Sequence, residues 1–154
     1  MYTGKVYSAI EGEENKPGSD KEWSRLVNAW ILGELLLSGS FKDAVSDAIL
    51  NKLNTGLVPT SLFCSAYKYG SANSAFRRLM VDIAVYHWDD DTMSKLYTER
   101  DQAATVPFYQ SIAVALLQWK QQPEIAKTAD IPTKVEGTSF YHEHGDKPCY
   151  KTMF

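Results

Sequence analysis

The chain has 154 residues, of which 44% are hydrophobic and 23% charged, and its formal net charge is -3. This length and composition predict one compact globular unit and exclude an intrinsically disordered chain. The acidic balance argues against a protein that binds nucleic acid or an anionic membrane by bulk charge, because such binding needs a surplus of lysine and arginine.

Nothing in the sequence points to export or to membrane insertion. No apolar run approaches the roughly 20 residues that span a bilayer. The start, Met1 to Lys5, lacks the apolar stretch of a signal peptide. Cys64 and Cys149 are too few for a disulfide scaffold and are expected to be free thiols in a reducing compartment. We therefore expect an intracellular protein, cytoplasmic or nuclear.

The N-terminal third of the chain predicts an extended start followed by a helical hairpin. Residues 2–10 favour one short strand or an extended lead-in, and a polar loop follows. Ser19 and Glu22 fit a capping box, and apolar residues at i, i+3 and i+4 then predict a helix up to the Ser-Gly-Ser break at 38–40. The hairpin is completed by a helix over 41–53.

The second helix of the hairpin is amphipathic. Its apolar residues share one face, whereas Asp43, Ser46 and Asp47 lie with the lysines on the opposite face. Gly56 follows the helix as a left-handed stop. The short gap between the two helices brings their apolar faces together.

Further helices follow along the chain, and we expect them over 60–69, 75–88, 92–100 and 107–121. Ser74 is the expected N-cap of the second of these, and Pro107 suits the first turn of the last. From Pro123 onward, proline and glycine predict an irregular tail, tethered or partly disordered. The fold class is mainly α: a helical hairpin followed by a small helical bundle, with an irregular C-terminal tail and at most one short N-terminal strand.

No sequence motif names a catalytic centre. The chain has no nucleophile elbow, phosphate-binding glycine loop, zinc-protease motif or calcium loop. The acidic run at 89–91 is explained by a solvated helix start rather than a magnesium site, because adjacent side chains point in different directions. We assign no catalytic, cofactor-binding or metal-binding residue, and we expect no cofactor and no enzymatic activity.

Two histidines and a cysteine near the C-terminus leave metal binding open. His142, His144 and Cys149 lie within eight positions and could supply three zinc ligands, with His87 or Cys64 as a distant fourth. The alternative is a loop whose polar rings face water or a neighbouring carboxylate. It is favoured because the two histidines point in opposite directions if the segment is extended, and because no Cys-x-x-Cys pair is present.

Aromatic and basic residues alternate between residues 67 and 78, which include Tyr67, Tyr69, Arg77 and Arg78. Such a surface could contact nucleic acid, or the arginine stems could lie over aromatic faces inside the fold. With a net charge of -3, we expect no nucleic-acid partner. The four tryptophans are expected either to build the core or to anchor an interface.

Several short motifs follow one another in order: MYTGKVY at 1–7, WILGE at 30–34, FKDA at 41–44, PT at 59–60, RRLMVD at 77–82, YHEH at 141–144 and PCY at 148–150. This series resembles the fungal BTB/POZ domain proteins, from a tight glycine turn late in the domain, through its last helical pair, to the helical region and closing motif that follow it. The resemblance implies a truncated BTB-like domain end at 1–56, the following helical region at 57–122 and an irregular tail at 123–154.

The resemblance also implies a function. Such a chain is a non-enzymatic protein-interaction module, an adaptor, for which a cullin-type ubiquitin ligase scaffold is a partner by family analogy alone. A complete domain carries a sheet and helices ahead of Tyr2 that form much of its dimer surface, so dimerisation by that route is not expected and the oligomeric state stays open. Some relatives carry a cysteine just before the closing Tyr-His pair, where this chain has Ser139 and Phe140. The alternative function is a small zinc-binding or nucleic-acid-associated regulator that uses the His/Cys tail.

The first helix carries more apolar surface than its hairpin partner can cover. Leu32 and Leu37 widen its apolar stripe, which predicts burial on more than one side. Without preceding domain elements, Leu32, Leu36 and Leu37 need cover from later helices or from another chain, because exposed leucines cost stability at about 25 cal/mol per Å². We expect the helix over 107–121 to be the internal cover.

Overall fold

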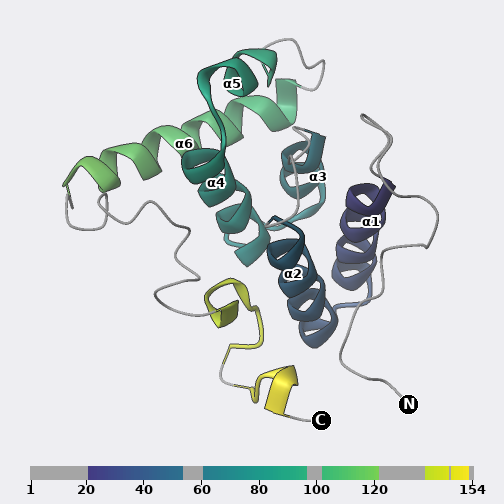
Figure 1. The fold of residues 1–154 in the computed structure, drawn as a ribbon. Helices are drawn as coiled ribbons and strands as arrows, with labels where there is room; N and C mark the ends of the chain where they lie inside the picture. The colour runs from purple at the N-terminus through teal and green to yellow at the C-terminus, as the bar shows by residue number, and fades with distance from the viewer. Residues whose placement is uncertain (1–20, 54–60, 97–101, 122–137, 146, 153–154) are drawn as a thin grey trace.

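The fold is seen in a computed structural model that describes residues 21–53, 61–96, 102–121, 138–145 and 147–152. These residues form six α-helices and two short 3-10 helices with no strand among them, which confirms the mainly α prediction (Figure 1). The predicted strand over 2–10, the capping box at Ser19, the stop at Gly56 and both expected boundaries, after 56 and after 122, lie outside the described residues.

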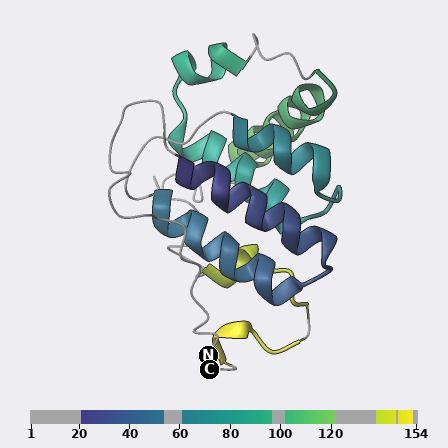
Figure 2. The same ribbon diagram turned by 90° about the vertical axis from the view of Figure 1, so that its right-hand side faces the viewer.

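The helices pack as a hairpin beside a small bundle (Figures 1 and 2). The hairpin contacts the bundle where α1 packs against α3, and within the bundle α6 lies across α3 and α4. None of the described helices combines the length and the apolarity that crossing a bilayer requires. In chain order the elements are α1 (Lys21–Leu35), α2 (Gly39–Leu53), α3 (Ser61–Tyr69), α4 (Ala75–His87), α5 (Asp90–Leu96), α6 (Gln102–Gln121), η1 (Thr138–Tyr141) and η2 (Tyr150–Thr152).

Stacked aromatic rings hold the hairpin and the bundle together. Trp30 of α1 stacks on Phe76 of α4 with ring centroids 4.3 Å apart, and Phe63 of α3 stacks on Phe108 of α6 at 4.5 Å. All four side chains are buried, as is Trp23. Such pairs add about 0.5–1.5 kcal/mol to what their burial provides. Trp23 and Trp30 are therefore core residues rather than interface anchors.

Three helices begin earlier than the sequence predicts. The helix α2 starts at Gly39 instead of residue 41, α5 starts at Asp90 instead of residue 92, and α6 starts at Gln102 instead of Pro107. Pro107 therefore lies inside α6, where its missing N–H removes one backbone hydrogen bond. The loss falls near the N-terminal end of the helix, and the Ser111 hydroxyl donates to the Pro107 carbonyl at 2.9 Å one turn later.

The turn from α1 to α2 is a Schellman-type cap. The Ser38 N–H donates to the Gly33 carbonyl at 3.0 Å, and the Leu37 N–H donates to the Glu34 carbonyl at 3.2 Å. Leu37 has a φ of 52°, in the left-handed region where glycine is the usual residue. A leucine costs about 1–2 kcal/mol in this conformation, because its Cβ crowds the following carbonyl.

Four leucines at the end of α1 form an exposed group that we call the leucine patch. Leu32, Leu35, Leu36 and Leu37 are 48%, 76%, 64% and 89% exposed. The prediction that Leu32 and Leu37 are buried on a second side is wrong, because the inner face of α1 is filled by residues such as Trp30. The prediction that α6 covers these leucines is also wrong, because α6 packs against α3 and α4.

Replacing Leu37 by glycine is expected to raise the free energy of unfolding by about 0.5–1 kcal/mol, because glycine avoids the Cβ cost but loses more chain entropy on folding. Leu37→Ala removes the same leucine and keeps the Cβ, so its stability is expected to stay within about 0.5 kcal/mol of the wild type. Urea unfolding followed by circular dichroism measures both variants. Equal stabilities of the glycine and alanine variants would contradict backbone strain at this position.

Candidate functional site

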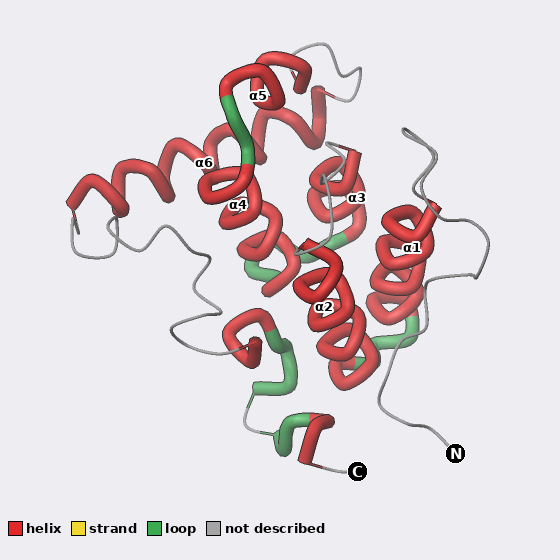
Figure 3. The backbone as a smooth tube through the Cα atoms, viewed as in Figure 1, coloured by secondary structure: helices red, strands yellow, loops and turns green. Residues whose placement is uncertain are grey.

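The described C-terminal segment, residues 138–152 without 146, lies along the hairpin (Figure 3). The turn η1 contacts α2 and α4, and η2 contacts α2. Tyr141, His142 and Tyr150 are all buried. The segment is irregular, as predicted, and its described part is packed against the helices, which agrees with the tethered alternative of the prediction.

The segment covers the polar face of α2. Asp43 is 0% exposed and Asp47 is 7% exposed, and Ser46 between them is buried as well. The two carboxylates lie four residues apart, which places them on one side of the helix. Because Asp43 and Asp47 lie opposite the apolar face of α2, the sequence suggests that they face water. The C-terminal segment covers this polar face instead, so both faces of α2 are buried.

Asp47 accepts three hydrogen bonds from the segment. The donors are His142 Nε2 at 3.1 Å, the Tyr150 hydroxyl and the Lys151 ammonium at 2.8 Å. Burial by itself raises the pKa of Asp47, but the bonds from these three donors outweigh burial and hold that pKa at about 2. Asp47 is therefore ionised at neutral pH and fastens the last described residues to α2.

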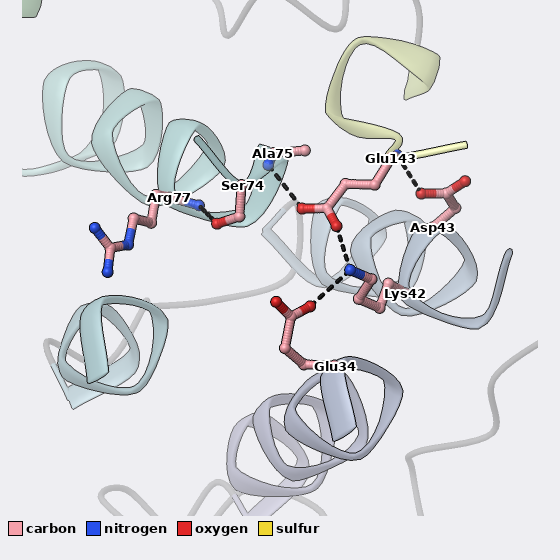
Figure 4. A network of polar contacts seen from close by, with 7 residues as sticks. All are labelled: Glu34, Lys42, Asp43, Ser74, Ala75, Arg77 and Glu143. Atoms are coloured by element: carbon pink, nitrogen blue, oxygen red, sulfur yellow. Dashed lines mark hydrogen bonds and ion pairs between the residues drawn. The ribbon is translucent and has the colours of Figure 1, made fainter. Parts of the chain in front are cut away.

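Glu143 joins the segment to three helices (Figure 4). Its backbone N–H donates to Asp43 Oδ1 at 2.6 Å. Its carboxylate pairs with the ammonium of Lys42 and accepts the Ala75 N–H at 2.8 Å, at the first residue of α4. Lys42 also pairs with Glu34 of α1 at 2.6 Å. One glutamate thus satisfies an otherwise unpaired N–H of α4 and links α4 with α2. Lys42 extends this link to α1 through Glu34.

The Ser74 N-cap of α4 is confirmed, because its hydroxyl accepts the Arg77 N–H at 3.2 Å (Figure 4). The Arg77 guanidinium donates to the carbonyls of Tyr67 and Gly70 at 2.8 and 2.7 Å, and it lies 4.6 Å from the centre of the Tyr67 ring. Arg77 therefore caps the C-terminal end of α3. Of the two alternatives for the basic and aromatic residues between 67 and 78, this contact is the one in which an arginine lies over an aromatic ring inside the fold.

The acidic run at 89–91 begins α5. The Asp89 carboxylate accepts the Thr92 N–H at 2.8 Å, and Asp89 is exposed together with Asp90 and Asp91. This geometry is that of a helix N-terminal cap.

His142, His144 and Cys149 come together between η1 and η2. Each offers one ligand atom, and these three atoms lie within 4.8 Å of one another, which makes the group one that could hold a metal ion. The two histidines are expected to point apart only in an extended segment, and this condition is not met, because the segment turns on either side of them. His87 and Cys64, considered above as a fourth ligand, are not members of this group.

The same region contains a series of thiol, imidazole and carboxylate. Cys149 Sγ lies 3.5 Å from His142 Nδ1, and the other nitrogen of that ring faces Asp47. This order also occurs in cysteine hydrolases, where a base activates a sulfur nucleophile. The His142 side chain is 0% exposed, however, so a substrate has no access to the ring that would act as the base.

Comparison with known proteins identifies no relative. No protein-family model matches the chain, and no curated protein or solved structure shows significant similarity to it.

Asp47→Asn is expected to lower the free energy of unfolding at pH 7 by about 2 kcal/mol, which corresponds to a pKa shift from 3.8 to about 2. The contribution of a carboxylate with a depressed pKa is complete above pH 3.8 and is lost as the pH falls toward 2. The stability difference between wild type and variant should therefore shrink over this range. Urea unfolding at a series of pH values measures it.

Asp90→Asn makes the same chemical change at the exposed start of α5 and is the matched control. Its effect on unfolding is expected to stay within about 0.5 kcal/mol. A stability difference for Asp47→Asn that does not change with pH would contradict the role assigned to the ionised carboxylate.

Glu143→Gln and Glu143→Ala separate the two roles of this side chain. Glutamine keeps an oxygen for the Ala75 N–H but loses the ion pair with Lys42, so a loss of about 1 kcal/mol is expected. Alanine loses both contacts, and a loss of about 2–3 kcal/mol is expected. Thermal unfolding compares the two variants. The same loss in both would mean that capping α4 contributes nothing.

Proposed function

We propose that the chain is a non-enzymatic protein-interaction module and that the leucine patch is its docking surface. The observation that carries the proposal is Leu37, an 89% exposed leucine held in a left-handed conformation. Glycine would fit this turn with less strain, and a polar residue would hydrate better. A residue that is unfavourable for both backbone and solvation is typical of a position kept for contact with another molecule.

The spacing of the leucines supports docking of a helix face. Leu32, Leu35 and Leu36 follow the i, i+3, i+4 pattern on one side of α1, and Leu37 extends the apolar surface past the end of the helix. Such a row packs between the ridges of a second helix. Contact would remove apolar area from water at about 25 cal/mol per Å², which supplies a driving force without any charged contact.

The partner that this patch fits is a second copy of the chain. All four members are leucine, so two copies placed about a two-fold axis bring the apolar side chains of one patch against those of the other. A patch with charged members would instead need a partner of opposite sign. We therefore propose that the leucine patch makes an isologous contact between two copies.

The resemblance to the fungal BTB/POZ proteins agrees with this class of function. Under the proposal, the chain is an intracellular adaptor of that kind, and a cullin-type scaffold is a partner that the resemblance alone suggests. The leucine contact differs from the dimer surface of a complete domain in that family, because it uses the end of α1.

Sedimentation and light scattering over a concentration series test the contact between copies. The wild type is expected to pass from monomer to dimer as its concentration rises. Leu37→Gly and Leu36→Ser are expected to raise the dissociation constant about tenfold or more, equivalent to about 1.4 kcal/mol. Leu37→Gly is informative because it is expected to stabilise the fold while it weakens association.

Leu117→Ser is the matched control, because Leu117 on α6 is 61% exposed and Leu36 is 64% exposed. This variant is expected to associate like the wild type. A wild-type protein that stays monomeric at every concentration would contradict the contact between copies. Equal weakening by Leu117→Ser would show that general hydrophobicity, and not the leucine patch, drives association.

A further inference from the structure

The cluster of His142, His144 and Cys149 has features that go beyond docking by the leucine patch. Its three ligand atoms lie within 4.8 Å of one another, on a segment that crosses the buried polar face of α2. The hydrogen-bond partners of each ring decide which nitrogen is available to a metal.

His142 is held by its Nε2 atom, which lies 3.1 Å from Asp47 Oδ1. An ionised carboxylate only accepts hydrogen bonds, so Nε2 carries the proton and the lone pair of the neutral ring is on Nδ1. A carboxylate behind the far nitrogen of a histidine is the usual support of a metal-binding imidazole, because it fixes the tautomer and the ring orientation. Nδ1 is therefore the nitrogen that faces the cluster.

His144 is arranged in the opposite sense. Its Nδ1 lies 2.9 Å from the carbonyl oxygen of Gly145, and since a carbonyl only accepts, Nδ1 carries the proton. The lone pair is then on Nε2, which is buried and has no hydrogen-bond partner among the described residues. A buried acceptor without a partner costs about 1–3 kcal/mol, and a bound cation would remove that cost.

Cys149 completes the group. Its Sγ lies 3.5 Å from His142 Nδ1. In a tetrahedral zinc site with Zn–N of about 2.0–2.1 Å and Zn–S of about 2.3 Å, the nitrogen and sulfur are separated by about 3.5 Å. This pair is thus already spaced as one edge of a zinc tetrahedron.

The surroundings favour a cation. Asp43 and Asp47 are both buried on the adjacent face of α2, and Asp43 Oδ2 has no hydrogen-bond partner among the described residues. Two imidazoles and a thiolate suit zinc, whereas magnesium and calcium prefer sets of oxygen ligands.

We infer that His142 Nδ1, His144 Nε2 and Cys149 Sγ bind one Zn²⁺ ion, with water in the fourth position. Three protein ligands with one open position are a common zinc arrangement. The ion holds together the residues between η1 and η2, which lie over α2. Two of its ligands, His142 and His144, are the residues on either side of Glu143. The site is independent of the leucine patch, so either proposal can fail alone.

Titration of the full chain with Zn²⁺, in competition with a chromophoric chelator, tests the site. Protein stripped of metal is expected to take up one Zn²⁺ per chain. Cys149→Ser and His144→Ala are each expected to weaken zinc binding by at least about 100-fold. A residue that only supports a ligand weakens binding by at most about 100-fold when it is lost. Co²⁺ replaces Zn²⁺ as a spectroscopic probe. The wild type should show a thiolate-to-cobalt charge-transfer band that Cys149→Ser abolishes.

Cys64→Ser and His87→Ala are the matched controls, because they remove the other thiol and the other histidine, which lie outside the cluster. Both are expected to bind zinc like the wild type. Circular dichroism of each metal-free variant checks that it is folded. Absence of stoichiometric zinc uptake, retention of the cobalt band in Cys149→Ser, or equal loss of binding in a control variant would overturn the site.

Discussion

The structure depends on two carboxylates that α2 buries on its polar side. Asp43 and Asp47 cannot leave water without hydrogen-bond donors, since an unpaired buried charge costs several kcal/mol. The donors come from the C-terminal segment: the Glu143 N–H serves Asp43, and His142, Tyr150 and Lys151 serve Asp47. This requirement brings together parts of the chain that are about 100 residues apart, and it positions His142 of the His/Cys cluster directly.

Two ion pairs connect the C-terminal segment to the end of α1 that carries the leucine patch. Glu143 binds Lys42, and Lys42 binds Glu34 in the last turn of α1. Gly33 lets the two helices approach, because a Cβ there would lie 2.7 Å from the side chain of Lys42. The inner side of α1 packs against α2 and α3, and Trp30 stacks on Phe76 of α4. The leucines of the patch lie outside these contacts.

The two proposed surfaces differ in chemistry. The leucine patch is apolar, carries its strain in the backbone of Leu37 and gains from removal of water. The cluster of His142, His144 and Cys149 is polar, and a cation would satisfy its buried nitrogen. A chain that uses both would combine association through an apolar helix end with a metal that holds its C-terminal segment in place.

The sequence by itself determined the mainly α class, the Ser74 cap, the end of α4 before the acidic run and the surplus of leucine on the first helix. These follow from local periodicity and capping, which depend on residues within a few positions of one another. Tertiary structure alone decided that Asp43 and Asp47 are buried, that His142 and Cys149 converge and that α6 leaves the leucines uncovered. Each of these outcomes depends on a partner distant in the chain, and the spacing of residues along one helix contains no information about what packs against its other side.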